Sequence, residues 1–178
     1  MKTNSAVIIV GGGLAGLTAA IHLSKIGVEV IVIEKNDFPK HKVCGEYISN
    51  EVLPYLNWLG VSVFDLKPTI IEKLEFSTSK GSTISCDLPL GGFGISRYAL
   101  DDFLYKKAVA NGCVFIHDTV QDITYLKNQF KISTAHNGVL KSEIAIGAFG
   151  KRSVIDQKLN RSFIQKKLLS RSRRLFQR

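Results

Sequence analysis

Three glycines near the start of the chain have the spacing of a loop that holds a diphosphate. Gly11, Gly13 and Gly16 form a GxGxxG pattern within the stretch VIIVGGGLAGLTAA. In such a pattern the first glycine makes a tight turn, the second lets the backbone approach a diphosphate, and the third lets a helix pack against a strand. Leu14 and Ala15 would then offer backbone N–H groups at the positive end of that helix.

An acidic residue follows at the distance where a ribose would lie. Glu34 stands 18 residues beyond Gly16, at the end of the apolar segment VEVIVIE. A carboxylate there accepts hydrogen bonds from ribose hydroxyls and repels a 2′-phosphate. The pattern predicts a site for FAD or NAD rather than NADP, with Glu34 and the adjacent Lys35 at the ribose. The alternative is a glycine-rich turn of an ordinary α/β protein, with Glu34 merely exposed.

The elements that must position these residues form a strand, a helix and a second strand, which is the unit of a parallel sheet. They are expected at 5–10, 14–26 and 28–34. Residues 35–60 resemble a loop and a short helix interrupted by Pro54. Further elements follow: two strands within 71–89 with a turn at 79–81, a helix over 96–112, a strand at 113–118, and a hairpin over 130–150 turning at Asn137-Gly138. The sequence predicts an α/β fold, a Rossmann-like parallel sheet with an inserted β-rich section.

Charge divides the chain into a neutral body and a basic end. The net charge is +9, yet residues 1–150 contain 14 basic and 14 acidic residues. We therefore expect a domain over 1–165 and a basic tail over 166–178, and no nucleic-acid-binding domain. Three interpretations of the tail compete: a peripheral contact with a membrane or an acidic partner, a solvated disordered end, or the remainder of a longer gene.

Cysteine and histidine usage indicates a cytoplasmic protein without a metal site. The three cysteines form no CxxC pair, which is typical of a reducing compartment. The four histidines show no metal-ligand spacing, and no GxSxG motif is present. No apolar stretch approaches the roughly 20 residues that span a membrane. The sequence assigns no catalytic residue.

Several stretches resemble one family of flavoproteins. GGGLAGLTAAIHLSKIGVEVIVIEK, FPKHKVCGEYIS, ISRYALDDFLYKKAVANGCVF and AIGAFGKRSVID are similar to the geranylgeranyl-reductase-like FAD-dependent oxidoreductases. These are relatives of p-hydroxybenzoate-hydroxylase-type monooxygenases and flavin-dependent halogenases. The resemblance covers about residues 5–165 and implies FAD at the glycine loop. The family's later Gly-Asp motif and returning strands have no counterpart, so the resemblance is to the N-terminal part only.

The resemblance implies roles for residues in the middle of the chain. Cys44 and Gly45 would lie close to the flavin, and Lys42 would meet a phosphate as a point charge. Arg97 would reach the cofactor from the start of a helix. Alternatively, Cys44 is a small buried apolar residue, and Arg97 is a surface arginine. A positive charge at a helix start opposes the helix dipole, so Arg97 needs a compensating partner.

Later positions are matched in the same way. The backbone near Val120 would lie beside the adenine, and the backbone of Ala148 and Gly150 would meet the cofactor. Phe149 stands where the family's GADGxxS motif has an aspartate that helps place flavin and pyridine nucleotide. This departure argues against direct use of NAD(P)H.

The expected function is that of an FAD-binding oxidoreductase of the reductase type. Such a protein transfers hydride or electrons through the flavin to an apolar small molecule, such as a prenyl or polyene double bond. One alternative is a flavoprotein monooxygenase or halogenase. Another is a non-catalytic nucleotide-binding fragment or interaction module. The sequence predicts no oligomeric state.

Overall fold

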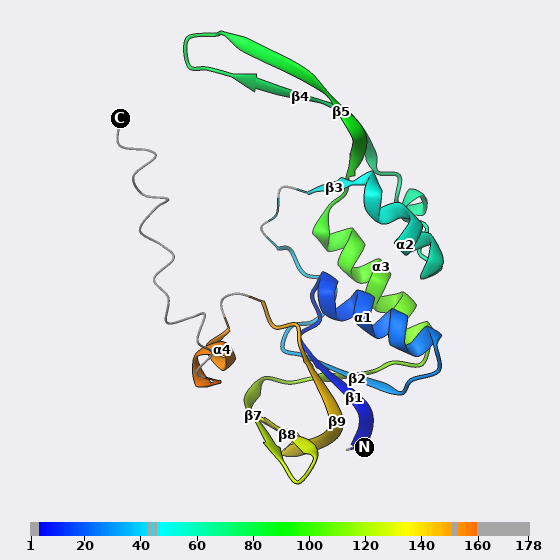
Figure 1. The fold of residues 1–178 in the computed structure, drawn as a ribbon, viewed down its shortest axis with the longest axis vertical. Coiled ribbons are helices and arrows are strands. Elements are labelled where there is room, and N and C mark those ends of the chain that lie inside the picture. The colour runs from blue at the N-terminus through cyan, green and yellow to red at the C-terminus, as the bar shows by residue number, and fades with distance from the viewer. Residues whose placement is uncertain (1–3, 43, 45, 151–152, 160–178) are drawn as a thin grey trace.

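A computed structural model of the chain describes residues 4–42, 44, 46–150 and 153–159 (Figure 1). Gly45 and the basic tail over 166–178 lie outside these residues. The helices are α1 (Leu14–Lys25), α2 (Leu53–Trp58), α3 (Arg97–Ala110) and α4 (Val154–Lys158). The strands are β1 (Asn4–Val10), β2 (Val30–Glu34), β3 (Tyr47–Ser49), β4 (Thr69–Ser77), β5 (Thr83–Gly94), β6 (Val114–His117), β7 (Val120–Leu126), β8 (Gln129–Thr134) and β9 (Val139–Gly147).

The larger sheet has six strands in the order β6-β2-β1-β9-β8-β7. β6, β2, β1 and β9 run parallel, whereas β8 and β7 pair antiparallel at one end. The predicted strand–helix–strand unit is therefore confirmed, within a mixed sheet. The carboxyl ends of β1, β2 and β6 meet at one edge, because Glu34 pairs with His117 and Val10 pairs with Ile33.

The inserted section forms a second sheet of three antiparallel strands, in the order β3-β5-β4. β4 and β5 make a long hairpin whose turn includes Gly81 at φ 84°, in agreement with the predicted turn. β3 pairs only with the end of β5, from Gly92 to Gly94. Figure 1 shows the rest of the β4–β5 hairpin extending away from the body of the molecule.

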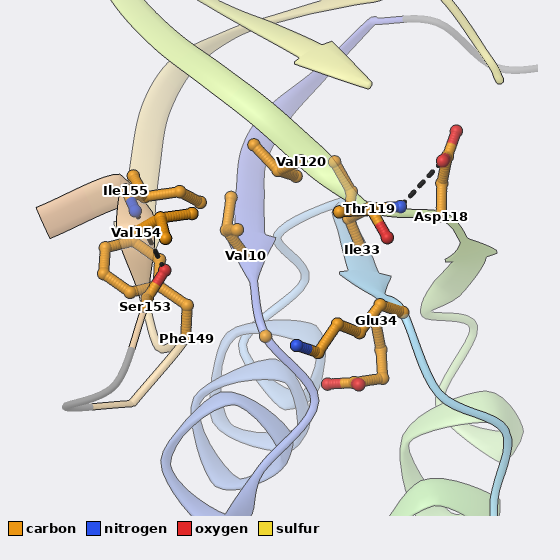
Figure 2. Close-up of a pocket in the computed structure, with 12 residues that line it drawn as sticks. Val10, Ile33, Glu34, Asp118, Thr119, Val120, Phe149, Ser153, Val154 and Ile155 are labelled. Atoms are coloured by element: carbon orange, nitrogen blue, oxygen red, sulfur yellow. Dashed lines mark hydrogen bonds between the residues drawn. The ribbon is translucent and has the colours of Figure 1, made fainter. Parts of the chain in front are cut away.

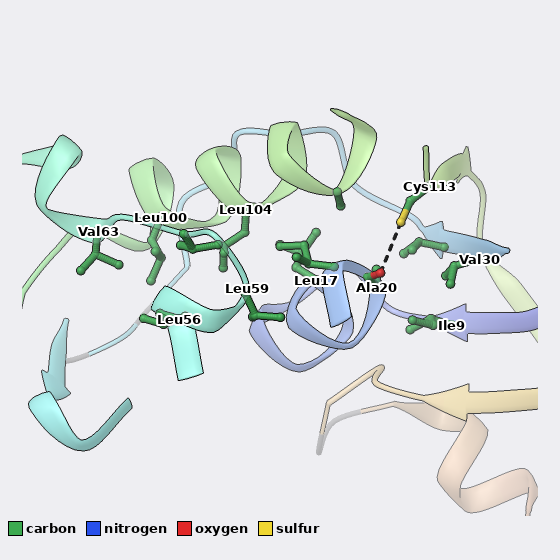
Figure 3. Close-up of a cluster of buried hydrophobic side chains, with 14 of the residues drawn as sticks. Ile9, Leu17, Ala20, Val30, Leu56, Leu59, Val63, Leu100, Leu104 and Cys113 are labelled. Atoms are coloured by element: carbon green, nitrogen blue, oxygen red, sulfur yellow. Dashed lines mark hydrogen bonds between the residues drawn. The ribbon is translucent and has the colours of Figure 1, made fainter. Parts of the chain in front are cut away.

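Alternating side chains of the buried strands feed two apolar clusters, one on each face of the larger sheet. Val7 and Ile9 of β1 face α1 and α3, and Figure 3 shows Ile9 below the Leu17, Leu59 and Leu104 side chains. Ile8 and Val10 face the opposite side, where they join Ile132 and other residues of the second cluster. Burying each such aliphatic side chain stabilises the fold by about 1.5–3 kcal/mol relative to leaving it exposed.

Two expectations about local structure are corrected. Pro54 does not interrupt a helix, because it occupies the first turn of α2, where its missing N–H leaves no hydrogen bond unmade. β3 and β7 lie where no strand is predicted. β3 has three residues, and only its pairing with β5 defines it. Among the described residues, no helix has the length and apolar content needed to cross a membrane.

Candidate functional site

Two of the three loop glycines are required by the packing of the backbone. Gly11 has φ 107°, and a Cβ there would lie 2.4 Å from the carbonyl oxygen of Ala148. A Cβ on Gly16 would lie 1.9 Å from the carbonyl oxygen of Gly11. Both distances are far below van der Waals contact, so any side chain would separate β1 from α1 or β9. These glycines hold the loop in its tight turn, as the spacing predicts.

Gly13 differs from them, because its surroundings are open. A Cβ on Gly13 would meet no atom within 4 Å, and its φ of −79° suits any residue. Gly13 is also the N-cap of α1, and no side chain caps the helix there. The N–H groups of the first turn, which begins at Leu14 and Ala15, therefore lack a side-chain acceptor and can bind an anion. The open space and the uncapped helix together fit a diphosphate.

Glu34 lies at the carboxyl end of β2, beside this loop. Its Oε2 atom accepts a hydrogen bond from the Gly12 N–H at 2.6 Å, and its Oε1 atom accepts from the backbone and side chain of Asn36. These bonds fix the carboxylate next to the glycine loop. A carboxylate has about four lone-pair sites, so Glu34 keeps acceptor capacity for ribose hydroxyls.

A cavity of about 280 Å³ lies at this edge of the sheet. Figure 2 shows Glu34 on one side of it and Phe149, Ser153 and Ile155 on the other. The lining residues come from the ends of β1, β2 and β9, the start of β7 and the start of α4: Val10, Gly11, Ile33, Glu34, Lys35, Asp118, Thr119, Val120, Phe149, Ser153, Val154 and Ile155. Open α/β sheets bind ligands at this place, outside the carboxyl ends of their strands.

Asp118 is a buried acid in the cavity wall that the sequence did not single out. Its Oδ2 atom accepts hydrogen bonds from the His136 N–H at 3.0 Å and from the Asn137 N–H at 2.9 Å and Nδ2 at 2.7 Å. Its Oδ1 atom accepts from the Thr119 N–H at 2.7 Å. Burial alone would raise the pKa of Asp118, but the hydrogen bonds from Asn137, His136 and Thr119 hold it well below its usual range.

A second group of polar residues surrounds the buried carboxylate of Asp101 on α3. The Lys42 ammonium lies 2.7 Å from Asp101, and Arg97 donates two hydrogen bonds to it, at 2.8 and 2.9 Å. The hydrogen bond with Asp101 raises the pKa of Arg97 more than burial lowers it, and the nearby Cys44 side chain raises it further. Asp101 is thus the partner that the sequence requires for a cation at the helix start.

Replacing Asp101 with alanine is expected to lower the free energy of unfolding by about 2–3 kcal/mol, because Arg97 and Lys42 would lose their shared buried acceptor. Urea denaturation measures the change. Asp102→Ala is the matched control, since Asp102 pairs with Lys106, whose side chain is 71% exposed, and should cost about 0.5 kcal/mol or less. Equal losses in the two variants would contradict the structural role of Asp101.

The structure brings the predicted residues together in two places. Gly11, Glu34, Lys35 and Val120 line the cavity, and Ala148 abuts Gly11, while their contacts with a cofactor stay predictions. Lys42 and Arg97 instead bind Asp101, and Cys44 lies beside Arg97.

Cys44 is exposed, so its interpretation as a small buried residue is wrong. Lys42 forms an ion pair with Asp101. Its contact with a phosphate stays a prediction. Gly150 has φ 76° and its carbonyl accepts from the Ser153 N–H, but Gly150 does not line the cavity.

The loop from Glu34 to Lys42 connects the two places. Phe38 lies against Gly12 and stacks on Tyr105 of α3, with ring centroids 4.5 Å apart. The Lys42 ammonium lies 5.9 Å from the Phe38 ring centroid. The loop thereby runs from Glu34 along α3 toward Asp101, which also binds Arg97. Within the described residues, no group of three or more His, Cys, Asp or Glu side chains could hold a metal ion.

Comparison with known proteins gives relatives of several activities. The chain is 28% identical to digeranylgeranylglycerophospholipid reductase 1 of Methanosphaera stadtmanae, over 89% of this chain and 40% of that protein. It is 29% identical to the FAD-dependent monooxygenase ausM of Emericella nidulans, over 86% of this chain and 34% of that protein. The chain thus spans about two fifths or less of the length of these relatives.

The fold is shared with solved flavoprotein structures. The halogenase PltM, in a crystal structure with phloroglucinol and FAD, superposes with a TM-score of 0.73 at 19% identity, over 88% of this chain and 36% of that one. A family model for the FAD binding domain matches residues 4–172, nearly the whole chain. The glycine loop, the ribose-side acid and the fold therefore agree with the family match, and the chain belongs to the FAD binding domain family.

Proposed function

We propose that this chain is the FAD-binding part of a reductase that passes hydride or electrons to an apolar small molecule. The observation that carries FAD binding is the open space at Gly13, which lies before an uncapped helix and directly after Gly12, to which Glu34 is hydrogen-bonded. The flavin, when bound, supplies two-electron chemistry, while the chain supplies position and electrostatics. The loop from Glu34 to Lys42, together with Arg97 of α3, would run along the extended cofactor.

Phe149 favours a reductase over a hydroxylase. Its ring packs over Gly147, where a Cβ would lie 2.8 Å from the Phe149 Cε1 atom, and it lines the cavity. The site thus has an apolar wall where the resembled motif has an aspartate. The similarity to a digeranylgeranylglycerophospholipid reductase supports a prenyl double bond as the acceptor.

Two alternative functions also have support. A monooxygenase or halogenase function is supported by the similarity to the monooxygenase ausM and to the fold of the halogenase PltM. A nucleotide-binding module without catalysis is a further candidate, supported by the glycine loop and Glu34 alone. We also propose a cytoplasmic location, on the free cysteines, and a peripheral membrane contact through residues 166–178, on their basic sequence alone.

An anaerobic reoxidation experiment separates these functions. The FAD-loaded chain is reduced with one equivalent of dithionite and mixed with a polyprenyl alcohol in the absence of oxygen. A reductase returns the flavin absorbance as the double bond gains a hydride and a proton. Recovery only after oxygen and a halide salt are admitted, with a hydroxylated or halogenated product, would instead support a monooxygenase or halogenase. Flavin that binds but passes electrons to neither acceptor would support the binding module.

Replacing Glu34 with arginine is expected to weaken FAD binding about 100-fold or more, because a hydrogen-bond donor replaces the acceptor for the ribose hydroxyls. The substitution also removes the hydrogen bonds that Glu34 accepts from the Gly12 and Asn36 N–H groups. A titration followed by flavin fluorescence measures the affinity, and circular dichroism checks the fold. Glu75→Arg, an equal charge change on the exposed hairpin, should bind FAD like the wild type. Unchanged affinity in Glu34→Arg would remove Glu34 from the site.

A further inference from the structure

Asp101 of α3 is a buried carboxylate that holds two cations at once. Its Oδ1 atom accepts a hydrogen bond from the Arg97 Nε atom at 2.8 Å, and its Oδ2 atom accepts from the Arg97 Nη2 atom at 2.9 Å and from the Lys42 ammonium at 2.7 Å. The Asp101 side chain is 1% exposed, so it offers no surface to a ligand. Any effect of Asp101 on a ligand must therefore act through one of these cations.

The Arg97 guanidinium keeps donors that Asp101 does not use. A guanidinium has five N–H groups, and Asp101 accepts from two of them, along the edge formed by Nε and Nη2. Nη1 and the second N–H of Nη2 form another forked edge, and Cys44 lies beside the group. The Arg97 side chain is 16% exposed, which leaves part of it within reach of a ligand. Because two bonds to Asp101 fix the plane of the group, the second edge has a set direction.

The start of α3 lies at the same edge of the larger sheet as the glycine loop. β2 and β6 are parallel neighbours, and α1 leads into β2 as α3 leads into β6. Both helices therefore begin at the carboxyl edge of the sheet, and Figure 1 shows them side by side. Phe38 connects the two places, because its ring lies against Gly12 and 5.9 Å from the Lys42 ammonium. Arg97, the first residue of α3, is thus a neighbour of the diphosphate loop.

We propose that Asp101 is a positioning residue that aims the Arg97 guanidinium at the ribityl and flavin part of FAD. The cavity beside Glu34 is assigned to the adenosine part, and neither Arg97 nor Asp101 lines it. The ribityl hydroxyls and the ring oxygens of the flavin accept hydrogen bonds, and a forked donor in a fixed orientation suits them. Lys42 completes the arrangement, because its bond to Oδ2 holds the carboxylate from the loop side. The inference rests on FAD as the ligand and not on the reductase activity.

Binding of FAD and of ADP to Asp101→Asn tests this role, because ADP lacks the ribityl and flavin part. Flavin fluorescence gives the FAD affinity, and titration calorimetry gives the ADP affinity. We expect Asp101→Asn to bind FAD about tenfold or more weakly, since charge-assisted bonds lose their geometry, and to bind ADP like the wild type. The loss of a negative charge would by itself favour the anionic cofactor, so weaker FAD binding reports lost orientation. A merely structural role would weaken both ligands alike, or neither.

Asp102→Asn is the matched control, since it makes the same charge change one residue further along α3. Asp102 pairs with Lys106, whose side chain is 71% exposed, and this variant should bind both ligands like the wild type. The double variant Arg97→Gln/Asp101→Asn should lose less FAD affinity than the two single losses combined, because Asp101 acts through Arg97.

Arg97→Lys is a second variant, which tests the same orientation if Asp101→Asn does not fold. It keeps both charges of the buried pair, but an ammonium offers no fork, so it should also weaken FAD binding and spare ADP. Wild-type FAD affinity in Arg97→Lys, or in a folded Asp101→Asn, would overturn the proposal. Equal losses of FAD and ADP, or additive losses in the double variant, would overturn it as well. A wild type that binds no FAD would instead overturn the cofactor assignment, and this proposal with it.

Discussion

Replacing Gly13 with alanine is expected to weaken FAD binding at least tenfold without lowering the stability of the chain. An added Cβ meets no protein atom within 4 Å, and the φ of −79° is compatible with alanine. Alanine restricts the unfolded chain, which adds about 0.4–1 kcal/mol, but it is a poorer N-cap than glycine by a similar amount, so the free energy of unfolding should stay nearly unchanged. The methyl group would instead occupy space that the diphosphate needs, and a tenfold loss corresponds to about 1.4 kcal/mol of binding free energy.

Gly16→Ala is the counterpart that separates folding from binding. Its Cβ would lie 1.9 Å from the Gly11 carbonyl oxygen, so we expect a loss of about 3 kcal/mol or more of stability, or no folded protein. Flavin fluorescence titration and urea denaturation of both variants measure the two effects. If Gly13→Ala binds FAD like the wild type, the diphosphate does not lie at this loop.

Replacing Asp118 with asparagine is expected to lower the free energy of unfolding by about 2–4 kcal/mol at pH 7. The amide nitrogen would face donors that now converge on the carboxylate, which leaves partly buried N–H groups without acceptors. The turn after β8 would loosen, and with it the wall of the cavity. Asn137→Ala, which removes only one side-chain donor, should cost about 1 kcal/mol. Asp87→Asn on the exposed hairpin is the control.

The effect of Asp118→Asn depends on pH in a defined direction. Because the folded-state pKa of Asp118 is lower than its unfolded-state value, the ionised carboxylate stabilises the fold above the unfolded pKa of about 3.9. That stabilisation is lost as the pH falls below this value. The difference in the free energy of unfolding between wild type and Asp118→Asn, measured by urea denaturation, should therefore narrow as the pH falls from 5 to 3. A difference that widens on acidification would contradict the account.

The glycine loop and its flanking strands could be predicted because their signals are local. β1, α1 and β2 are consecutive, both strands are apolar on both faces, and Gly11, Gly16 and Glu34 act within this unit. The helix at Ser96 was found for a similar reason, since the Ser96 hydroxyl accepts a hydrogen bond from the Ala99 N–H. These signals lie within short stretches of the sequence, although the packing that requires Gly11 also involves the distant Ala148.

The remainder of the site depends on contacts between distant segments. Asp118 lines the cavity only because β6 lies beside β2, where the Asp118 N–H donates to the Glu34 carbonyl. Its position directly after an apolar strand was the available signal, because ligand sites gather at the carboxyl ends of such strands. β7 was missed because its residues from Thr124 to Leu126 are exposed, and its pairing with β8 defines it.

A titration of the chain with FAD, followed by competition with ADP and with FMN, tests the central claim most directly. The cavity, the glycine loop and Glu34 are assigned to the adenosine diphosphate half of the cofactor. We expect flavin fluorescence to report saturable FAD binding, ADP to displace the FAD, and FMN at the same concentration to leave it bound. A chain that binds no FAD, or one from which FMN displaces FAD as readily as ADP does, would contradict the assignment of this site.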